Sequence, residues 1–195
     1  SAVSTGHSNN RWQFTNMGTS GGQFVRLFNG ADTPLLYNGS SWATTAITGS
    51  GLTAANLIWG NLHQRRLWVG EEDSLSAWYL GVNSVSGAAT EFPLAGIASK
   101  GGYIQAMGTW TRDSGAGQDD VAVFLTSEGE AIVYSGTDPA AAATWQLVGV
   151  FAIGKPIGRR CIVKAGSDII LMTQDGFVPL SGILSMDRSQ SRLVA

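Results

Sequence analysis

The sequence predicts an all-β fold of short antiparallel strands, and its most regular stretch supplies two of the reasons. Between Asp120 and Phe151, apolar runs rich in β-branched and aromatic residues alternate with turns made of Gly, Asp and Pro. That alternation is typical of a β-meander and requires no helix. The first run, Val121 to Leu125, is apolar at every position, so we expect its sheet to be buried on both faces.

A third observation, internal repetition, specifies the architecture. A Tyr-x-Gly tripeptide recurs along the chain, at Tyr37, Tyr79, Tyr134 and, in a weaker form, Leu180. The intervals are 42 residues (79 − 37), 55 (134 − 79) and 46 (180 − 134), near the period of about 40–50 residues found in propeller blades. The sequence therefore predicts a β-propeller of about four antiparallel four-stranded blades, either complete or an incomplete arc of a larger propeller.

A second marker agrees with the first. The turn Thr126-Ser-Glu-Gly matches Thr173-Gln-Asp-Gly, 47 residues later (173 − 126), and each precedes the third strand of its blade. An aromatic residue opens the fourth strand of the first three blades, at Trp42, Phe92 and Trp145. The fourth blade shows no such strand, so we expect it to stop one strand short.

These markers divide the chain into six parts. Residues 1–10 are polar and are expected to form a loose N-terminal segment. The blades are expected at about 11–47, 56–94, 103–153 and 160–182. The C-terminal segment 183–195 mixes apolar and charged residues, and we expect it to be a short helix or to lead into a further domain. Because the chain does not begin with Met, we expect it to be a fragment of a longer protein.

Composition supports a folded protein rich in turns. Of its 195 residues, 44% are hydrophobic and only 13% are charged, and there are 26 Gly and 7 Trp. Such a chain has ample apolar surface for one core or one repeat array. A net charge of −2 does not favour nucleic acid or an anionic membrane as partner. No apolar run approaches the roughly 18–20 residues of a membrane span.

Few residues point to catalysis or to a cofactor. The single cysteine, Cys161, excludes an internal disulfide and a Cys-rich zinc site, and we expect it to be a buried thiol. The two histidines, His7 and His63, accompany no recognised nucleophile pattern and are expected to be surface imidazoles. We therefore expect no enzyme activity, no catalytic residue and no cofactor.

One acidic loop and two arginine pairs remain as candidate sites. The Gly-rich loop holds three candidate metal ligands, Asp113, Asp119 and Asp120, whose oxygens suit a hard cation, although their spacing is not that of an EF-hand. The simpler interpretation is a solvated loop without metal. Each arginine pair lies at the start of a predicted strand, at Arg65-Arg66 and Arg159-Arg160. Arginines there suit phosphate or a partner's carboxylates, and ordinary rim charge is the alternative.

Five sequence runs resemble a family of virion structural proteins of phages and prophages. These are Gln64-Arg-Arg-Leu-Trp-Val69, Ala77-Trp-Tyr-Leu80, Thr126-Ser-Glu-Gly-Glu130, Tyr134-Ser-Gly-Thr-Asp-Pro139 and Gly158-Arg-Arg160. The resemblance covers Leu35 to about Ser181. It implies a β-propeller of the tail or head-to-tail hub, similar to packaged-DNA stabilisation proteins, with a structural role and no catalytic residue. Members of the family are generally much longer.

The leading hypothesis is therefore a non-enzymatic virion component that acts as a protein–protein interaction module. Its expected partners are other virion proteins, in a homo- or hetero-oligomer, and a contact with DNA stays open although the charge does not support it. We expect it in the phage tail or head-to-tail region, and in the host cytoplasm during assembly. Two alternatives are a propeller that binds or hydrolyses carbohydrate and a cellular protein-interaction propeller unrelated to phages.

Overall fold

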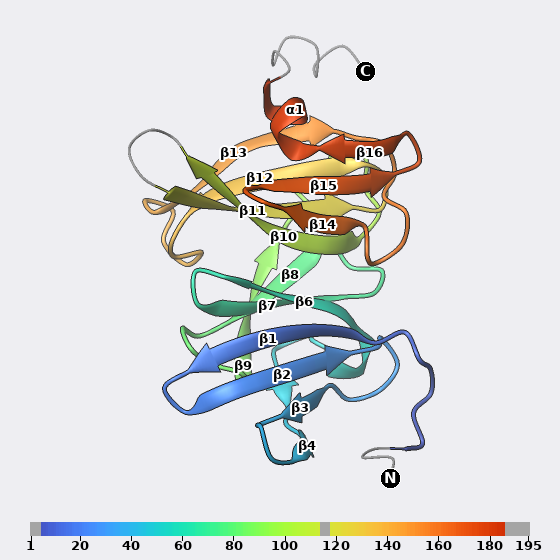
Figure 1. The fold of residues 1–195 in the computed structure, drawn as a ribbon, viewed down its shortest axis with the longest axis vertical. Helices are drawn as coiled ribbons and strands as arrows, with labels where there is room; N and C mark the ends of the chain where they lie inside the picture. The colour runs from blue at the N-terminus through green and yellow to red at the C-terminus, as the bar shows by residue number, and fades with distance from the viewer. Residues whose placement is uncertain (1–4, 114–117, 186–195) are drawn as a thin grey trace. The chain divides into compact units, whose positions relative to one another are not determined.

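The computed structural model describes residues 5–113 and 118–185, and its regular structure is almost entirely β (Figure 1). In these residues the strands form four sheets that follow one another along the chain, antiparallel apart from one short parallel pairing. Two compact units, Ser1–Pro93 and Leu94–Ala195, each hold two of the sheets. The predicted all-β fold class, with four small sheets like the blades of a four-bladed β-propeller, is confirmed.

The first sheet is a four-stranded meander in the order β1-β2-β3-β4. Its strands are β1 (Gln13–Thr19), β2 (Gly22–Phe28), β3 (Leu35–Tyr37) and β4 (Trp42–Thr44). Side chains along a strand alternate between faces, so Met17 and Phe28 are buried whereas Phe14 is exposed. One face of this sheet therefore belongs to a core, and Phe14 marks the other.

The second sheet has five strands in the order β5-β9-β8-β7-β6. Its elements are β5 (Ile47–Thr48), the 3-10 helix η1 (Ala54–Asn56), β6 (Leu57–His63), β7 (Arg66–Glu71), β8 (Ser76–Leu80) and β9 (Gly87–Pro93). Ile47, which the sequence placed at the end of the first blade, instead pairs in parallel with Gly87 on the edge of the second. A strand of two residues carries too little periodicity to reveal its partner.

The core of the first unit lies between these two sheets. Met17 and Phe28 of the first sheet pack with residues from the second sheet, namely Ile47, Leu57, Leu67, Val69, Trp78 and Leu80. Gly60 makes the close approach possible, because a Cβ at that position would overlap the Phe28 ring. The two sheets therefore pack face to face, as blades do.

The second unit holds the third and fourth sheets, in the orders β10-β11-β12-β13 and β14-β15-β16. The third sheet consists of β10 (Ile104–Asp113), β11 (Gln118–Thr126), β12 (Glu130–Gly136) and β13 (Trp145–Ala152). The fourth consists of β14 (Ile162–Ala165), β15 (Asp168–Thr173) and β16 (Gly176–Pro179). In the described residues the fourth sheet has three strands, one fewer than the third, as the sequence predicts.

A short helix, α1 (Leu180–Ser185), follows β16 directly. The weak tripeptide copy at Leu180 therefore begins a helix and does not end a third strand. Leu180 and Ile183 are buried in the core of the second unit, together with Val123, Leu125 and Leu171. The helix begins three residues before segment 183–195, for which a short helix was one of the two expectations, and residues 186–195 lie outside the described part of the chain.

The two sequence markers have a structural basis. Tyr37 and Trp42 lie opposite each other on β3 and β4, with ring centroids 4.9 Å apart, and Tyr134 stacks on Trp145 at 5.5 Å. In the first and third sheets the Tyr-x-Gly motif and the following aromatic residue thus bring rings of the third and fourth strands into contact, whereas in the second sheet Tyr79 and Phe92 both contact Trp68. The matching four-residue turns end with Gly129 and Gly176, which have φ values of 86° and 115°.

Candidate functional site

The first arginine pair lies at the turn between β6 and β7, and each member contacts its own unit. Arg65 Nε donates to Asn83 Oδ1 at 3.2 Å, and the Arg65 carbonyl accepts from the Asn83 N–H at 2.8 Å. Arg66 donates to the Leu80 carbonyl at 3.4 Å, and its guanidinium carbon lies 5.7 Å from the centre of the Tyr79 ring. These contacts hold the turn against β8 and the loop after it, which is a structural use of both side chains.

The second pair belongs to the loop between β13 and β14. Arg159 is half-buried and Arg160 is exposed, and they precede the buried Cys161. Burial raises the pKa of the Cys161 thiol to about 11, so the thiol is protonated and unreactive at neutral pH. The two arginine pairs lie in different units and remain separate candidates for contacts with a partner.

Of the three aspartates of the acidic loop, the structure describes the side chain of one. Asp120 Oδ1 accepts a hydrogen bond from Thr111 Oγ1 at 2.7 Å across β10 and β11. The side chains of Asp113 and Asp119 lie outside the described residues. Among the residues that are described, no group of three or more His, Cys, Asp or Glu side chains is placed to hold a metal ion.

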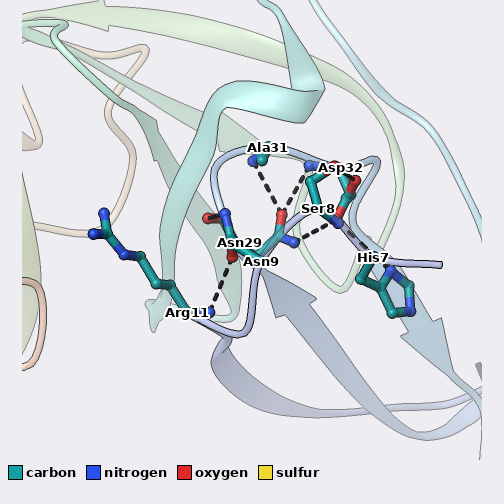
Figure 2. A network of polar contacts seen from close by, with 7 residues as sticks. All are labelled: His7, Ser8, Asn9, Arg11, Asn29, Ala31 and Asp32. Carbon is teal, nitrogen blue, oxygen red and sulfur yellow. Dashed lines mark hydrogen bonds and ion pairs between the residues drawn. The ribbon is translucent and has the colours of Figure 1, made fainter. Parts of the chain in front are cut away.

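The expectation that His63 is a surface imidazole is wrong, because this side chain is only 2% exposed. It ends β6 opposite Arg66, at a position that a hairpin pattern alone would leave in solvent. His7, in contrast, takes part in a polar network at the start of the chain. Figure 2 shows this N-terminal cluster, whose members are His7, Ser8, Asn9, Arg11, Asn29, Ala31 and Asp32.

Asp32, in the loop between β2 and β3, is the centre of the N-terminal cluster. Its carboxylate accepts from the Ser8 N–H at 2.9 Å, from Ser8 Oγ at 2.6 Å and from Asn29 Nδ2 at 2.6 Å. Asn29 Oδ1 in turn accepts from the N–H groups of Ala31 and Asp32. Segment 1–10 was expected to be loose, and in the structure these bonds fasten Ser8 to the first sheet.

A serine, a histidine and an aspartate meet here, but not in the order that catalysis needs. In a catalytic triad the imidazole lies between the serine hydroxyl and the carboxylate. Here Ser8 Oγ donates directly to Asp32, and His7 Nδ1 lies 3.7 Å from the same carboxylate. The carboxylate, not the imidazole, occupies the central position. The cluster therefore attaches the N-terminal segment to the loop between β2 and β3, and its geometry does not activate Ser8 as a nucleophile.

The N-terminal cluster has a testable dependence on pH. Hydrogen bonds from the Ser8 hydroxyl, from Asn29 and from the Ser8 N–H lower the pKa of Asp32 below its ordinary value of 3.8. The bonds therefore stabilise the fold fully above the unfolded-state pKa and lose that contribution as pH falls through the folded-state pKa. We expect Asp32→Asn to lower Tm at pH 6, and the difference from the parent to close as pH falls through and below the ordinary carboxyl range.

Thermal melts at constant ionic strength measure this difference. Asp73→Asn is the matched control, because Asp73 is exposed at a hairpin tip, and it is expected to change Tm little at any pH. A difference between parent and Asp32→Asn that stays constant down to pH 2 would contradict the assignment.

The contact between Ser8 and Asp32 recurs twice in the second unit. Ser99 donates from its N–H and its hydroxyl to Glu130 Oε1, at 3.1 and 2.5 Å. Ser181 does the same to Asp168, at 3.2 and 2.5 Å. We call these three pairs the carboxylate clamps. Each fastens a connecting segment or the C-terminal helix to a sheet, so these carboxylates serve the fold.

Sequence reasoning missed the carboxylate clamps. Their partners are 24, 31 and 13 residues apart, so no spacing links them in the sequence. It also missed Arg26, a buried side chain that donates to the carbonyls of Pro34 at 3.5 Å and Thr45 at 2.5 Å. Burial lowers the pKa of Arg26 to about 10, so the guanidinium is still charged at neutral pH.

Comparisons of the chain with protein families, with curated proteins and with solved structures find no match. The site therefore rests on geometry alone. In the part of the chain that the structure describes, no helix has the length and apolarity that crossing a membrane requires.

Two exposed apolar sheet faces are the most distinctive surface features. Residues directly opposite on antiparallel strands share a face. In the first sheet this rule defines the sheet-1 outer face, which includes the polar Asn16 and the buried Leu35 and whose other large apolar residues are Phe14, Val25, Leu27, Tyr37 and Trp42. In the fourth sheet it defines the sheet-4 outer face, which carries Asp168 at one end and whose larger apolar residues are Val163, Ile170, Met172, Phe177 and Pro179. Exposed apolar surface of this kind makes the two faces candidates for contact with another molecule.

Proposed function

We propose that the chain is a non-enzymatic structural component of a phage or prophage virion, in the tail or the head-to-tail hub. In this role it is a protein–protein interaction module whose partners are other virion proteins. It acts in the particle, and in the host cytoplasm while particles assemble. The sequence runs quoted above support the phage assignment, and the two outer faces support the interaction role.

The exposure of large apolar side chains is the main observation that supports the interaction role. Phe14 is 68% exposed and Phe177 is 76% exposed, each on a sheet whose opposite face is buried. An isolated soluble domain keeps such residues few and scattered. Rigid sheets that present apolar faces are suited to docking, because ordering the interface costs little conformational entropy.

A non-enzymatic role agrees with the use of the polar groups that are placed. Three carboxylates hold Ser8, Ser99 and Ser181 in the clamps. The Cys161 thiol is buried with a raised pKa. A nucleophilic thiol needs to be open to substrate and to have a pKa lowered toward neutral, and the Cys161 thiol has neither property.

Particle composition tests the proposal. Particles produced by the phage or prophage that encodes the chain are purified on a density gradient, and the chain is quantified by mass spectrometry against the major capsid protein. The expected result is a constant ratio of the chain to capsid protein across the particle peak. Recovery of the chain only in the soluble lysate fraction would overturn the virion assignment.

The carbohydrate alternative is tested separately with the purified chain on a glycan array and in a turnover assay. We expect neither binding nor hydrolysis. Saccharide binding that is lost on Trp42→Ala, and kept in a variant of an exposed polar residue such as Ser40→Ala, would favour that alternative instead.

A further inference from the structure

We propose that His63 is the trigger of a pH-sensitive latch: when its imidazole takes up a proton, the turn between β6 and β7 opens and releases the loop between β8 and β9, residues 81–86. The latch lies within the first unit and does not depend on the proposed virion role. Three features of the structure support it, namely the burial of His63, the charges around it and the backbone of the turn.

His63 ends β6 at a position that is unfavourable for a positive charge. Its side chain is only 2% exposed, so a protonated imidazole there would lose most of its hydration. Arg66 lies directly opposite on β7, and residues in that relation share a face of the sheet. An arginine side chain stays protonated in proteins. Burial and a neighbouring like charge therefore both oppose protonation of His63 in the folded chain.

Among the described residues, the strands packed on β6 place no carboxylate beside His63. These strands are β7 and, from the first sheet, β1 and β2. Their charged residues are Arg26 on β2 and Arg66 and Glu71 on β7. Glu71 pairs at the opposite end of β6, about 20 Å away along the strand. The turn adds another cation, Arg65, and the loop 81–86 has no charged residue. The charges that face His63 are therefore positive.

The turn between β6 and β7 is strained, which makes it the place where this hairpin opens most easily. Gln64 has a φ of 48° and Arg65 a φ of 59°, in the left-handed region that is unfavourable for residues with a side chain. Asn83, in the loop 81–86, has a φ of 58°. Residues strained in this way keep their conformation only while surrounding contacts hold them, and they cluster in segments that switch.

Hydrogen bonds attach the loop 81–86 to this turn. The Arg65 carbonyl accepts from the Asn83 N–H at 2.8 Å, and Arg65 Nε donates to Asn83 Oδ1 at 3.2 Å. Arg66 donates to the Leu80 carbonyl, just before the loop, at 3.4 Å. Opening of the turn breaks these contacts together and frees the loop. Further along, β7 and β8 contribute to the core of the first unit, which confines the opening to the end of the hairpin.

The sign of the pH dependence follows from these contacts. An imidazole in an opened segment takes up a proton below about pH 6.5. In the closed latch the imidazole stays neutral, so the opened form binds more protons and gains population as pH falls. The latch is therefore closed above about pH 6.5, and protection of its amides falls by about tenfold from pH 7.5 to pH 5.5.

Hydrogen exchange measured by mass spectrometry tests the latch. Peptides that cover residues 60–67 and 81–86 are followed at pH 7.5 and pH 5.5, with exchange times scaled for the intrinsic effect of pH. In the parent, we expect both peptides to lose about tenfold in protection at the lower pH, and β8 to keep its protection. His63→Gln has a polar side chain that takes up no proton, and is expected to be protected equally at both pH values.

His7→Gln is the matched control, because it removes the other histidine of the chain, and it is expected to behave like the parent. Three results would each overturn the inference: equal protection of the parent at both pH values, a loss of protection that persists in His63→Gln, or a loss in β8 as large as in the loop. The last would indicate unfolding of the whole unit.

A measurement on the parent decides the matter even if His63→Gln does not fold. The carbon-bound protons of an imidazole shift in the NMR spectrum when the ring takes up a proton. We expect the His63 signal of the closed form to keep its neutral position down to pH 5.5. A His63 signal that moves through the ordinary histidine range, about pH 6.5, while the loop 81–86 stays protected would overturn the inference.

Discussion

Replacing Gly136 with alanine is expected to lower the free energy of unfolding by about 3 kcal/mol or more, because two costs combine. Gly136 ends β12 with a φ of 128°, a conformation that side-chain-bearing residues rarely adopt. A Cβ there would also overlap the Thr144 carbonyl, and this obstacle is backbone that cannot rotate away. The neighbouring Trp145 would be displaced from its stack on Tyr134.

Gly166→Ala is the matched control for this substitution. Gly166 also has a positive φ, of 63°, but nothing lies within 4 Å of the position that a Cβ would take. It should therefore show only the backbone cost of about 1–2 kcal/mol. Urea unfolding monitored by tryptophan fluorescence measures both variants. Equal losses in the two would show that the close approach to Thr144 contributes nothing.

Replacing Glu130 with alanine is expected to cost about 3 kcal/mol, since hydrogen bonds to a charged acceptor contribute about 1.5–3 kcal/mol each and are not additive. The side chain is 2% exposed. It accepts from the Ser99 N–H, from Ser99 Oγ and from the Lys100 N–H, the last at 3.0 Å. We expect the amides of Ser99 and Lys100 to exchange with solvent faster in the variant, because they lose their acceptor.

Glu128→Ala is the control, two residues away on the turn between β11 and β12. Glu128 forms an ion pair with Lys155 at 2.5 Å, and both side chains are substantially exposed. Exposed pairs of this kind contribute about 0–1 kcal/mol. A loss in Glu128→Ala as large as that in Glu130→Ala would mean that the clamp has no special stabilising effect.

The strands and their order were predictable because the signals that encode them are local. Val121 to Leu125 is apolar at every position, and all five side chains are indeed buried. In the first and third sheets the Tyr-x-Gly motif marks a contact between consecutive strands, so its copies are visible in the sequence as a period. Fold class and sheet order follow from such short-range patterns.

What the sequence did not reveal depends on partners far along the chain. Arginine is ordinarily exposed, so the burial of Arg26 depends on two carbonyls that only the folded chain brings to it. The clamps join residues that no motif links. The outer faces could not be predicted for another reason. A continuous run of apolar residues shows that both sides of a strand are apolar, and only the packing shows which side is covered.

The parallel pairing of β5 with β9 has a consequence for the time course of folding. The first sheet closes through hairpins, whose contacts form among near neighbours in the chain. Ile47 finds its partner Gly87 only after 40 further residues (87 − 47), and closing so long a loop is slow compared with hairpin formation. During synthesis, the segment that emerges after β4 has no strand to join until nearly the whole unit has left the ribosome. We therefore expect the docking of β5 on β9 to be among the late steps in ordering the first unit.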